Sequence, residues 1–442
     1  MQVVSVVLAA AAVGALLGGA TADFLGRRRG ILLCAGVFCA GAGAMALAPD
    51  FAVLLLGRAC VGLAIGASGM VVSVYMSEIS PPHLRGPLVA VNEFAVCTGC
   101  LVALLVSAGL QDTGAADAWR WSLGLSAVPA ALQLMGASLL PVSPHWLAVR
   151  ALHACCDGGL LSGMALTGPG DDGVAAQPGC PDTPTPRPED RWEALPPEQE
   201  LAGVVAGFLR SQHGNEATRQ SSAGSCLAEL SRTWKELRAT LDVPGGRFAL
   251  GLAVSAAVTQ NLAFSNAMLY YARPIFEAGG ITSSWLPSVG VGLAKFAGVA
   301  IALPLLARLP RRLLLGAGMV TQVAACVAMA AAFTALPAES PGLQAAVTVG
   351  MLVFILAWDC SWAPGMWVVC SELLPTRSRG TGMGLAVAAF WATSAVANQT
   401  VLSIAEATSW SAFMVIVAVL TTFATGFVVA VLPETQGKSL EE

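Results

Sequence analysis

Eleven apolar segments, each long enough to cross a membrane, run through this sequence of 442 residues. A membrane-spanning helix needs about 20 mostly apolar residues. Five such segments precede a long polar stretch, and six follow it. They lie at residues 2–22, 31–49, 52–77, 87–110 and 119–141, and then at 248–272, 284–306, 312–335, 345–371, 381–404 and 410–432. This pattern predicts an all-α, multi-pass membrane protein.

Charge is scarce and unevenly distributed along the chain. Charged residues make up 11% of the sequence, whereas soluble globular proteins carry about a quarter. Residues 148–247 alone hold 9 of the 23 basic and 13 of the 27 acidic side chains. The net charge of −4 and the lack of a basic tract argue against a nucleic-acid partner.

The sequence shows no arrangement of residues that is typical of covalent chemistry. Its 12 cysteines are scattered, mostly within the apolar segments, without the spacing of a metal site or a disulfide framework. It contains no phosphate-binding loop and no nucleophile constellation. We therefore expect no enzymatic activity, no catalytic residue, no metal and no cofactor.

Arginines in the short connections predict the orientation in the membrane. Basic connections follow the first, third, seventh and ninth spans, whereas those near 49–50, 111–118 and 336–342 contain no basic residue. We expect the basic connections, the polar stretch and the C-terminus to face the cytosol. Eleven spans then place residue 1 on the outer side, which suggests that a further segment precedes it.

An internal repeat relates the two groups of spans. Residues 77–86 and 371–380 both fit S-E-[IL]-x-P-x-x-x-R-G, at an offset of 294. Weaker echoes pair residues 26–28 with 310–312 and residues 141–143 with 433–435. We predict two parallel halves, 1–147 and 248–434, joined by a partly disordered cytosolic loop, 148–247, with short helices, and followed by a cytosolic tail, 435–442. Such halves form a transport pathway along their interface, with the ligand near the membrane midplane.

Several motifs in this frame match a known family. Residues 19–28 read GATADFLGRR, residues 58–62 read RACVG, and residues 75–78 with 85–86 read YMSE and RG. Residues 119–121, 141–144 and 433–440 read WRW, PVSP and PETQGKSL. Together they resemble the signatures of the sugar porter family of the major facilitator superfamily. Residues 92–93 are more similar to divergent facilitative hexose transporters, and residues 380–402 to polyol porters. The resemblance implies the major facilitator fold with twelve helices, of which the first is expected to be missing from this sequence.

The resemblance also implies that charged pairs at cytosolic helix ends hold the halves together while the transporter is open outward. Topology signal and solvated loop charge form the competing interpretation, which we favour for Arg29 and Arg377. Ala307 and Pro310 replace Asp23 and Gly26 in the second half, so we expect a weaker latch there. The candidate latch residues are Gly19, Asp23, Gly26, Arg27, Arg28, Arg58, Glu78, Arg85, Glu372 and Arg379.

A sugar site is implied by residues 260–271, which resemble the family pattern Q-Q-x-x-G-x-N-x-x-x-Y-Y. Trp367 matches the tryptophan that stacks on the sugar ring, and Trp391 fits a second aromatic position. Helix–helix hydrogen bonds and interface anchoring are the competing interpretations. The candidate substrate-binding residues are Gln260, Asn261, Asn266, Tyr271, Trp367, Trp391, Glu93, Lys295 and Asp359.

Three of these candidates, Glu93, Lys295 and Asp359, are charges inside apolar segments. Charges buried in a membrane protein need partners. We therefore predict that Lys295 neutralises one of the two acids across the cavity.

These observations predict alternating-access transport of a monosaccharide (hexose) or polyol, by a facilitative mechanism. Proton-coupled symport of the same substrates is an alternative, because an arginine at the place of Arg58 faces a first-helix aspartate in proton-coupled members of the family. A non-transporting sugar sensor or a truncated, inactive paralogue is an alternative of another class. The expected partners are the sugar or polyol, the lipid bilayer and, for symport, protons. The expected location is the plasma membrane or an internal membrane, such as a vacuolar membrane or plastid envelope.

Overall fold

The computed structural model describes residues 2–79, 85–112, 117–142, 246–281, 285–374 and 379–434. Every regular element within these ranges is a helix. The described helices belong to one compact unit, made of residues 1–141 and 228–442. The predicted tail and nearly all of the predicted central loop lie outside the described residues.

Each predicted span corresponds to one helix or to a group of short helices. The first half contains α1 (Gln2–Leu25), α2 (Arg27–Ala46), α3 (Phe51–Ile79), α4 (Arg85–Asp112), α5 (Ala118–Gly124) and α6 (Ala127–Leu139). The second half contains α10 (Gly246–Leu262), α11 (Ser265–Tyr270), α12 (Ala272–Ala278), α13 (Trp285–Arg308), α14 (Arg311–Ala335), α15 (Pro341–Leu373), α16 (Arg379–Ala407) and α17 (Trp410–Ala430). Ten stretches of the described chain are long and apolar enough to cross a membrane, and α1 adds a shorter one, Val3–Gly19. The predicted all-helical membrane fold is confirmed.

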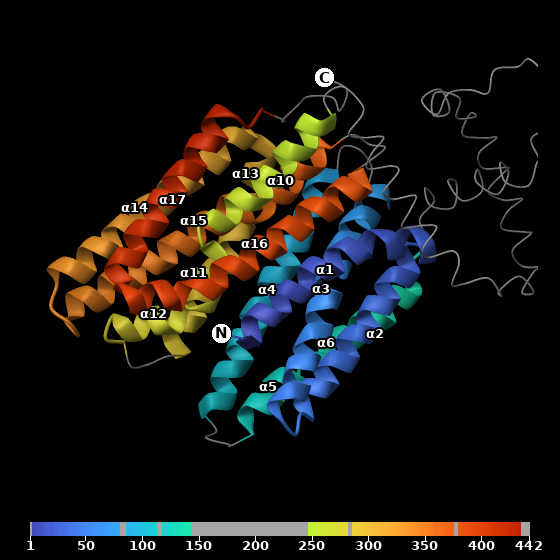
Figure 1. Cartoon of the computed structure of the whole chain (residues 1–442), viewed down its shortest axis with the longest axis horizontal. Helices are drawn as coiled ribbons and strands as arrows, with labels where there is room; N and C mark the ends of the chain where they lie inside the picture. The colour runs from blue at the N-terminus through green and yellow to red at the C-terminus, as the bar shows by residue number, and fades with distance from the viewer. Residues whose placement is uncertain are drawn as a thin grey trace, which may run out of the picture. The chain divides into compact units, whose positions relative to one another are not determined.

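Glycines let α1 pack closely against α3. A Cβ atom added at Gly62 or Gly66 would run into the backbone of α1, and one at Gly14 into the backbone of α3. In lipid the hydrophobic effect does not drive apolar helices together. Small residues stabilise such pairs because they permit close van der Waals contact between the backbones. On its other side α1 lies along α16 of the second half (Figure 1), where the Ser5 hydroxyl donates a hydrogen bond to Gln399. Helix α1 therefore joins the two halves.

The sixth predicted span is interrupted between α10 and α11. Phe264 at the break has φ = 53°, a left-handed conformation that is unusual for a side chain of its size. Its ring packs edge-on against Phe413 of α17, with 5.8 Å between centroids, which helps to hold the break in place. Broken backbone at membrane depth is tolerated where protein buries it or where it lines a cavity. This break lies within the predicted sugar-binding motif.

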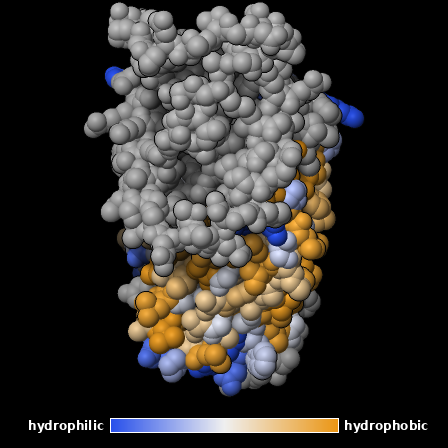
Figure 2. All heavy atoms as spheres, turned by 90° about the vertical axis from the view of Figure 1, so that its right-hand side faces the viewer, coloured by the Kyte–Doolittle hydropathy of each residue, from blue (hydrophilic) through white to orange (hydrophobic). Residues whose placement is uncertain are grey.

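Large apolar side chains are exposed on the outer faces of the helices. On α2 and α6 they include Leu33, Leu132, Met135 and Leu139. In Figure 2 the coloured surface in the lower part of the face is mostly apolar, with hydrophilic residues along its lower edge. An apolar surface of this extent is unfavourable in water and suits contact with lipid.

Candidate functional site

A buried cluster of three charged side chains joins the two halves. The Lys295 ammonium on α13 lies 2.8 Å from Asp359 Oδ1 on α15 and 3.8 Å from Glu93 Oε1 on α4. The exposed fractions of the three side chains are 3%, 0% and 12% respectively. The predicted pairing of Lys295 with an acid is thus confirmed as a contact, and the lysine contacts both acids.

Glycines on α13 allow the neighbouring helices to reach this cluster. A Cβ atom at Gly298 would lie 2.7 Å from Asp359 Cβ, and one at Gly292 would lie 2.9 Å from a methyl carbon of Leu104 on α4. A larger residue at Gly298 would press on the backbone of α15, whereas one at Gly292 would mainly displace flexible leucine side chains of α4. Phe94 and Phe296 pack across the same α4–α13 contact, with centroids 5.0 Å apart.

Two further groups surround the cluster that were not among the predicted site residues. The Lys295 ammonium lies 4.6 Å from the centroid of the Trp358 ring, which provides a cation–π contact. Cys97 Sγ lies 3.7 Å from Asp359 Oδ1. The sequence did hold a signal for Cys97, because it follows Glu93 by four residues and so shares its helix face.

The charge of the cluster does not balance when every group is ionised. Two carboxylates and one ammonium leave a net charge of −1. Asp359 Oδ1 has partners, but its buried Oδ2 atom has no hydrogen-bond partner among the described residues. A buried charge without compensation is costly.

The predicted amide residues lie at the break between α10 and α11. Asn261 Nδ2 donates to the Phe390 carbonyl of α16 at 2.8 Å, and Asn261 Oδ1 accepts from Asn266 at 3.4 Å. Asn261 therefore makes a hydrogen bond between helices, which is the structural role that we set against sugar binding in the sequence analysis. Gln260 differs, because its buried Oε1 atom has no partner in the described part of the chain. The hydroxyl of buried Tyr271 is likewise without a partner there.

Aromatic side chains gather on α15 and α16. Trp367 and Trp391 both lie against Phe390, with ring centroids 5.7 Å and 5.0 Å away. They also pack at the contact between Ala15 of α1 and Val387 of α16, so they lie where the halves meet. Both indoles remain partly exposed. Trp367 also lies close to Glu93, which connects this aromatic group to the charged cluster.

The repeated motifs form equivalent ion pairs in the two halves. Arg27 pairs with Glu78 at 2.9 Å, and Arg311 pairs with Glu372 at 3.3 Å. The second half therefore keeps this pair despite the replacement of Asp23 and Gly26. Next to the Arg311–Glu372 pair, Glu434 of the PETQGKSL motif accepts hydrogen bonds from the backbone N–H groups of Arg311 and Arg312, at the start of α14. A carboxylate is favourable at a helix N-terminus.

The other predicted latch residues have mixed positions. Gly26 precedes α2 with φ = 85°, a conformation that glycine adopts readily. Gly19 is buried next to Met70, and Arg28 donates a hydrogen bond to the Ser138 carbonyl. The side chains of Asp23, Arg85 and Arg379 lie outside the described residues.

Arg58 does not join the latch pairs. It lies 20 residues before Glu78 on α3, which corresponds to about 30 Å along the helix. Among the described residues no carboxylate lies within ion-pair distance of Arg58, and its buried Nε atom has no hydrogen-bond partner.

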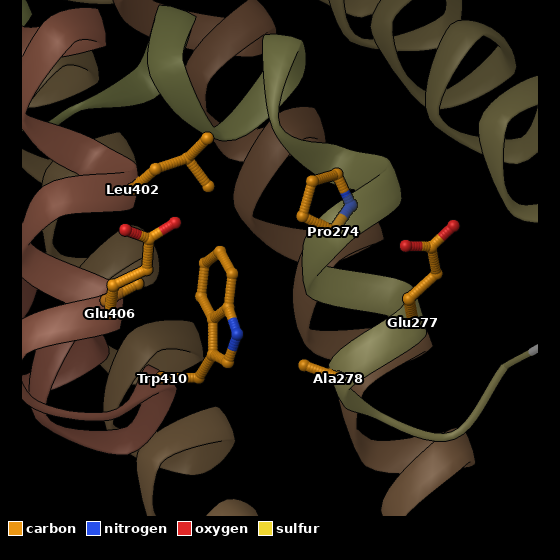
Figure 3. A pocket seen from close by; sticks show the side chains of 7 residues that line it. Pro274, Glu277, Ala278, Leu402, Glu406 and Trp410 are labelled. Atoms are coloured by element: carbon orange, nitrogen blue, oxygen red, sulfur yellow. The ribbon is translucent and has the colours of Figure 1, made fainter. Parts of the chain in front are cut away.

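A cavity of about 370 Å³ opens between α12, α16 and the start of α17. Its lining residues are Pro274, Glu277, Ala278, Leu402, Ala405, Glu406 and Trp410. Figure 3 shows the Trp410 indole between Glu406 and Leu402 on one side and Pro274 and Ala278 on the other. None of these residues belongs to the predicted sugar-binding set, so this cavity is separate from it.

The fold and the site define a class of protein. Two sets of helices meet along α1–α16 and α4–α13. Charged and polar side chains are buried where they meet, and partly buried aromatic side chains lie beside them. This is the organisation of a polytopic membrane transporter with the major facilitator fold. The sugar (and other) transporter family matches residues 1–155 and 200–442, and the chain belongs to that family. It is a transporter and not an enzyme.

Individual relatives agree with this assignment. The chain is 30% identical to the putative metabolite transport protein YwtG of Bacillus subtilis, over 100% of this chain and 85% of the relative. It is 29% identical to the glucose transporter GlcP of Staphylococcus epidermidis, over 100% of this chain and 86% of the relative. Among solved structures, the proton:xylose symporter XylE of the major facilitator superfamily is similar, with a TM-score of 0.69 and 22% identity. That match covers 100% of this chain and 88% of XylE. At this identity the structural likeness shows the fold alone.

Proposed function

We propose that this protein moves a monosaccharide or a polyol across a membrane by alternating access. The two halves rock about a site near the midplane, with the basic helix-end motifs on the cytosolic side. GlcP is a glucose transporter and XylE a xylose symporter, and these names support a monosaccharide as the substrate class.

The buried, unpartnered amide oxygen of Gln260 is the observation that carries the proposal. Buried polar atoms in proteins are almost always hydrogen-bonded, and one left without a partner costs about 1–3 kcal/mol. A sugar hydroxyl would supply the missing donor. The neighbouring Asn266 amide and Tyr271 hydroxyl provide further polar groups at the same helix break.

The aromatic group supplies the second requirement for sugar binding. A pyranose ring has one apolar face, which stacks on an aromatic surface while its hydroxyls bind amides. Trp367 and Trp391 are partly exposed at the contact between the halves, where alternating access requires the ligand to lie.

Proton-coupled symport is the second candidate mechanism for the same substrates. XylE is a proton:xylose symporter. The unbalanced charge of Glu93, Lys295 and Asp359 favours coupling to a proton over simple facilitation, because it provides a titratable group between the halves.

Uptake of labelled hexoses, pentoses and polyols by transporter-null cells that express the chain tests the proposal. We expect saturable uptake of at least one monosaccharide or polyol, and a higher KM for Gln260→Ala at equal surface expression. Saturable binding without flux would instead identify a sensor. Neither binding nor flux for any of these compounds would contradict the proposed substrate class.

A further inference from the structure

The cluster of Glu93, Lys295 and Asp359 contains one more negative than positive charge. Asp359 and Lys295 form a short pair at 2.8 Å, which neutralises both. Glu93 is the remaining charge, held 3.8 Å from the same ammonium and slightly exposed, at 12%. In a buried site a proton on one carboxylate removes the excess charge at little cost.

We propose that Glu93 carries one exchangeable proton, which it takes up from water and releases to water during each transport cycle. The inference rests on the proposed sugar transport and adds the ion and the group that carries it. The step forms an O–H bond on the Glu93 carboxylate and breaks it again on the other side of the membrane. No bond of the sugar changes.

The position of Glu93 explains how its proton would control the movement of the halves. Glu93 is on α4 of the first half, whereas Lys295 and Asp359 are on α13 and α15 of the second half. The Glu93–Lys295 attraction therefore holds the two halves together at the α4–α13 contact. Protonation of Glu93 removes this attraction and leaves the neutral Lys295–Asp359 pair within one half.

The same cluster is connected to the proposed sugar site. Trp367, the predicted stacking residue, lies close to Glu93. A sugar that moves Trp367 would thus change the surroundings of the carboxylate, and the charge on Glu93 would in turn affect the aromatic surface. Coupling between two ligands requires such a difference in contacts between states.

A proton fits this cluster better than a metal cation. One oxygen of Glu93, one oxygen of Asp359 and the Cys97 sulfur lie within 4.8 Å of one another. The Lys295 ammonium occupies the space beside them and would repel a second cation at this distance. Thiol sulfur is also a poor ligand for alkali and alkaline-earth ions, which prefer oxygen.

Other titratable groups facing the cluster do not balance its charge. Among the described residues they are Cys97 and Cys100 on α4, Tyr270 on α11 and Cys360 on α15, all neutral when protonated. Arg58 of α3 lies near Tyr270, and no ion pair joins it to the cluster among the described residues. The carboxylates of Glu93 and Asp359 are therefore the groups whose protonation changes the balance.

Proteoliposomes with the purified full chain separate this inference from the proposed function. Counterflow of a labelled sugar, without any ion gradient, tests transport alone. An imposed pH gradient then tests coupling, and with one proton per sugar a gradient of one pH unit supports at most about tenfold accumulation. We expect several-fold accumulation by the wild-type chain. For Glu93→Gln we expect no accumulation driven by the pH gradient, with the accumulation of each variant normalised to its own counterflow rate.

Matched variants define the controls. Asp117→Asn also removes a carboxylate, but an exposed one that pairs with Arg120, and it should accumulate sugar like the wild type. Glu93→Asp keeps a titratable group and should retain accumulation. Counterflow by the wild type without accumulation under a pH gradient would overturn the inference, as would accumulation by Glu93→Gln or accumulation driven by sodium. Absence of counterflow would contradict the proposed function instead.

A measurement without sugar covers the case in which no substrate has been found. Infrared difference spectra of the purified protein between acid and alkaline pH should contain the C=O stretch of a buried, protonated carboxyl group. We expect this band to disappear in Glu93→Gln and to remain in Asp117→Asn. A band that persists in Glu93→Gln, or is absent from the wild type, would contradict the assignment.

Discussion

Replacing Lys295 with methionine removes the positive charge between Glu93 and Asp359 while keeping a side chain of similar length. The variant leaves two carboxylates with oxygens within 4.8 Å of each other, one of them fully buried. Removal of one partner from a buried ion pair typically costs about 3–5 kcal/mol, because the other charge stays buried without compensation. We expect Lys295→Met to be destabilised by this amount.

The apparent melting temperature in detergent, followed by size-exclusion chromatography after heating, measures this loss. A change of 1 kcal/mol shifts the Tm of a domain of 150–250 residues by about 2–4 °C, and larger chains shift less. We therefore expect Lys295→Met to melt roughly 3–10 °C below the wild type. Uptake should fall together with the amount of folded protein.

Second substitutions test whether charge is the cause. Adding Asp359→Asn to Lys295→Met leaves Glu93 as the remaining acid of the cluster, and Glu93 is slightly exposed. This double variant should recover much of the lost stability. Lys295→Met with Glu93→Gln should recover less, because the fully buried Asp359 stays charged or must bind a proton.

The Arg273–Glu277 pair provides a matched control. Its N···O distance of 2.7 Å is close to the 2.8 Å of Lys295–Asp359, but its side chains are 62% and 51% exposed. Exposed pairs contribute about 0–1 kcal/mol, so Arg273→Met should change the melting temperature little. Wild-type stability of Lys295→Met, or no recovery in either double variant, would refute this reasoning.

Three further predictions concern other parts of the chain. Trp367→Ala should raise the Kd for the sugar about tenfold in equilibrium binding, because roughly 1–1.5 kcal/mol of aromatic contact is lost. An unchanged Kd would show that Trp367 does not belong to the sugar site. Gly66→Val should abolish monodisperse protein, because its Cβ would meet the α1 backbone, whereas Gly99→Val, with open space, should be tolerated. Arg27→Met should slow uptake, because it breaks the ion pair with Glu78. The charge-swapped double variant Arg27→Glu/Glu78→Arg should restore part of the uptake rate. An uptake rate of the double variant no higher than that of Arg27→Met would argue against the ion pair.

The sequence predicts the helices well, because a membrane-spanning helix can be recognised from a run of about 20 mostly apolar residues. Each predicted segment became a helix or a group of helices in the described part of the chain. The ion pair of Lys295 was also predictable. A charge within an apolar segment is costly to bury, and pairing with an opposite charge lowers that cost. Sequence alone did not tell which acid lies closer, since that depends on the close approach of α13 and α15 at Gly298.

Other features depend on tertiary contacts that a single sequence does not record. The left-handed turn at Phe264 is invisible to hydropathy, because phenylalanine is apolar and common in straight helices. The hydrogen bond from Asn261 to Phe390 joins residues 129 positions apart. Arg58 was grouped with the latch from its motif, but its distance along α3 from Glu78 separates the two. The cavity near Trp410 combines three helices and carries no local pattern.

Counterflow of labelled monosaccharides and polyols in proteoliposomes is the most direct measurement of the central claim, that sugar binds between the halves at the α10–α11 break. Gln260→Ala is the test variant. Gln322→Ala is its control, since Gln322 is also a buried glutamine whose amide atoms have no partner among the described residues, but it lies on α14 outside the predicted site. We predict saturable counterflow by the wild-type chain and by Gln322→Ala, and a rise in the half-saturating sugar concentration for Gln260→Ala. Equal half-saturation in all three proteins would contradict the proposed site, and no counterflow of any sugar or polyol would contradict the proposed function.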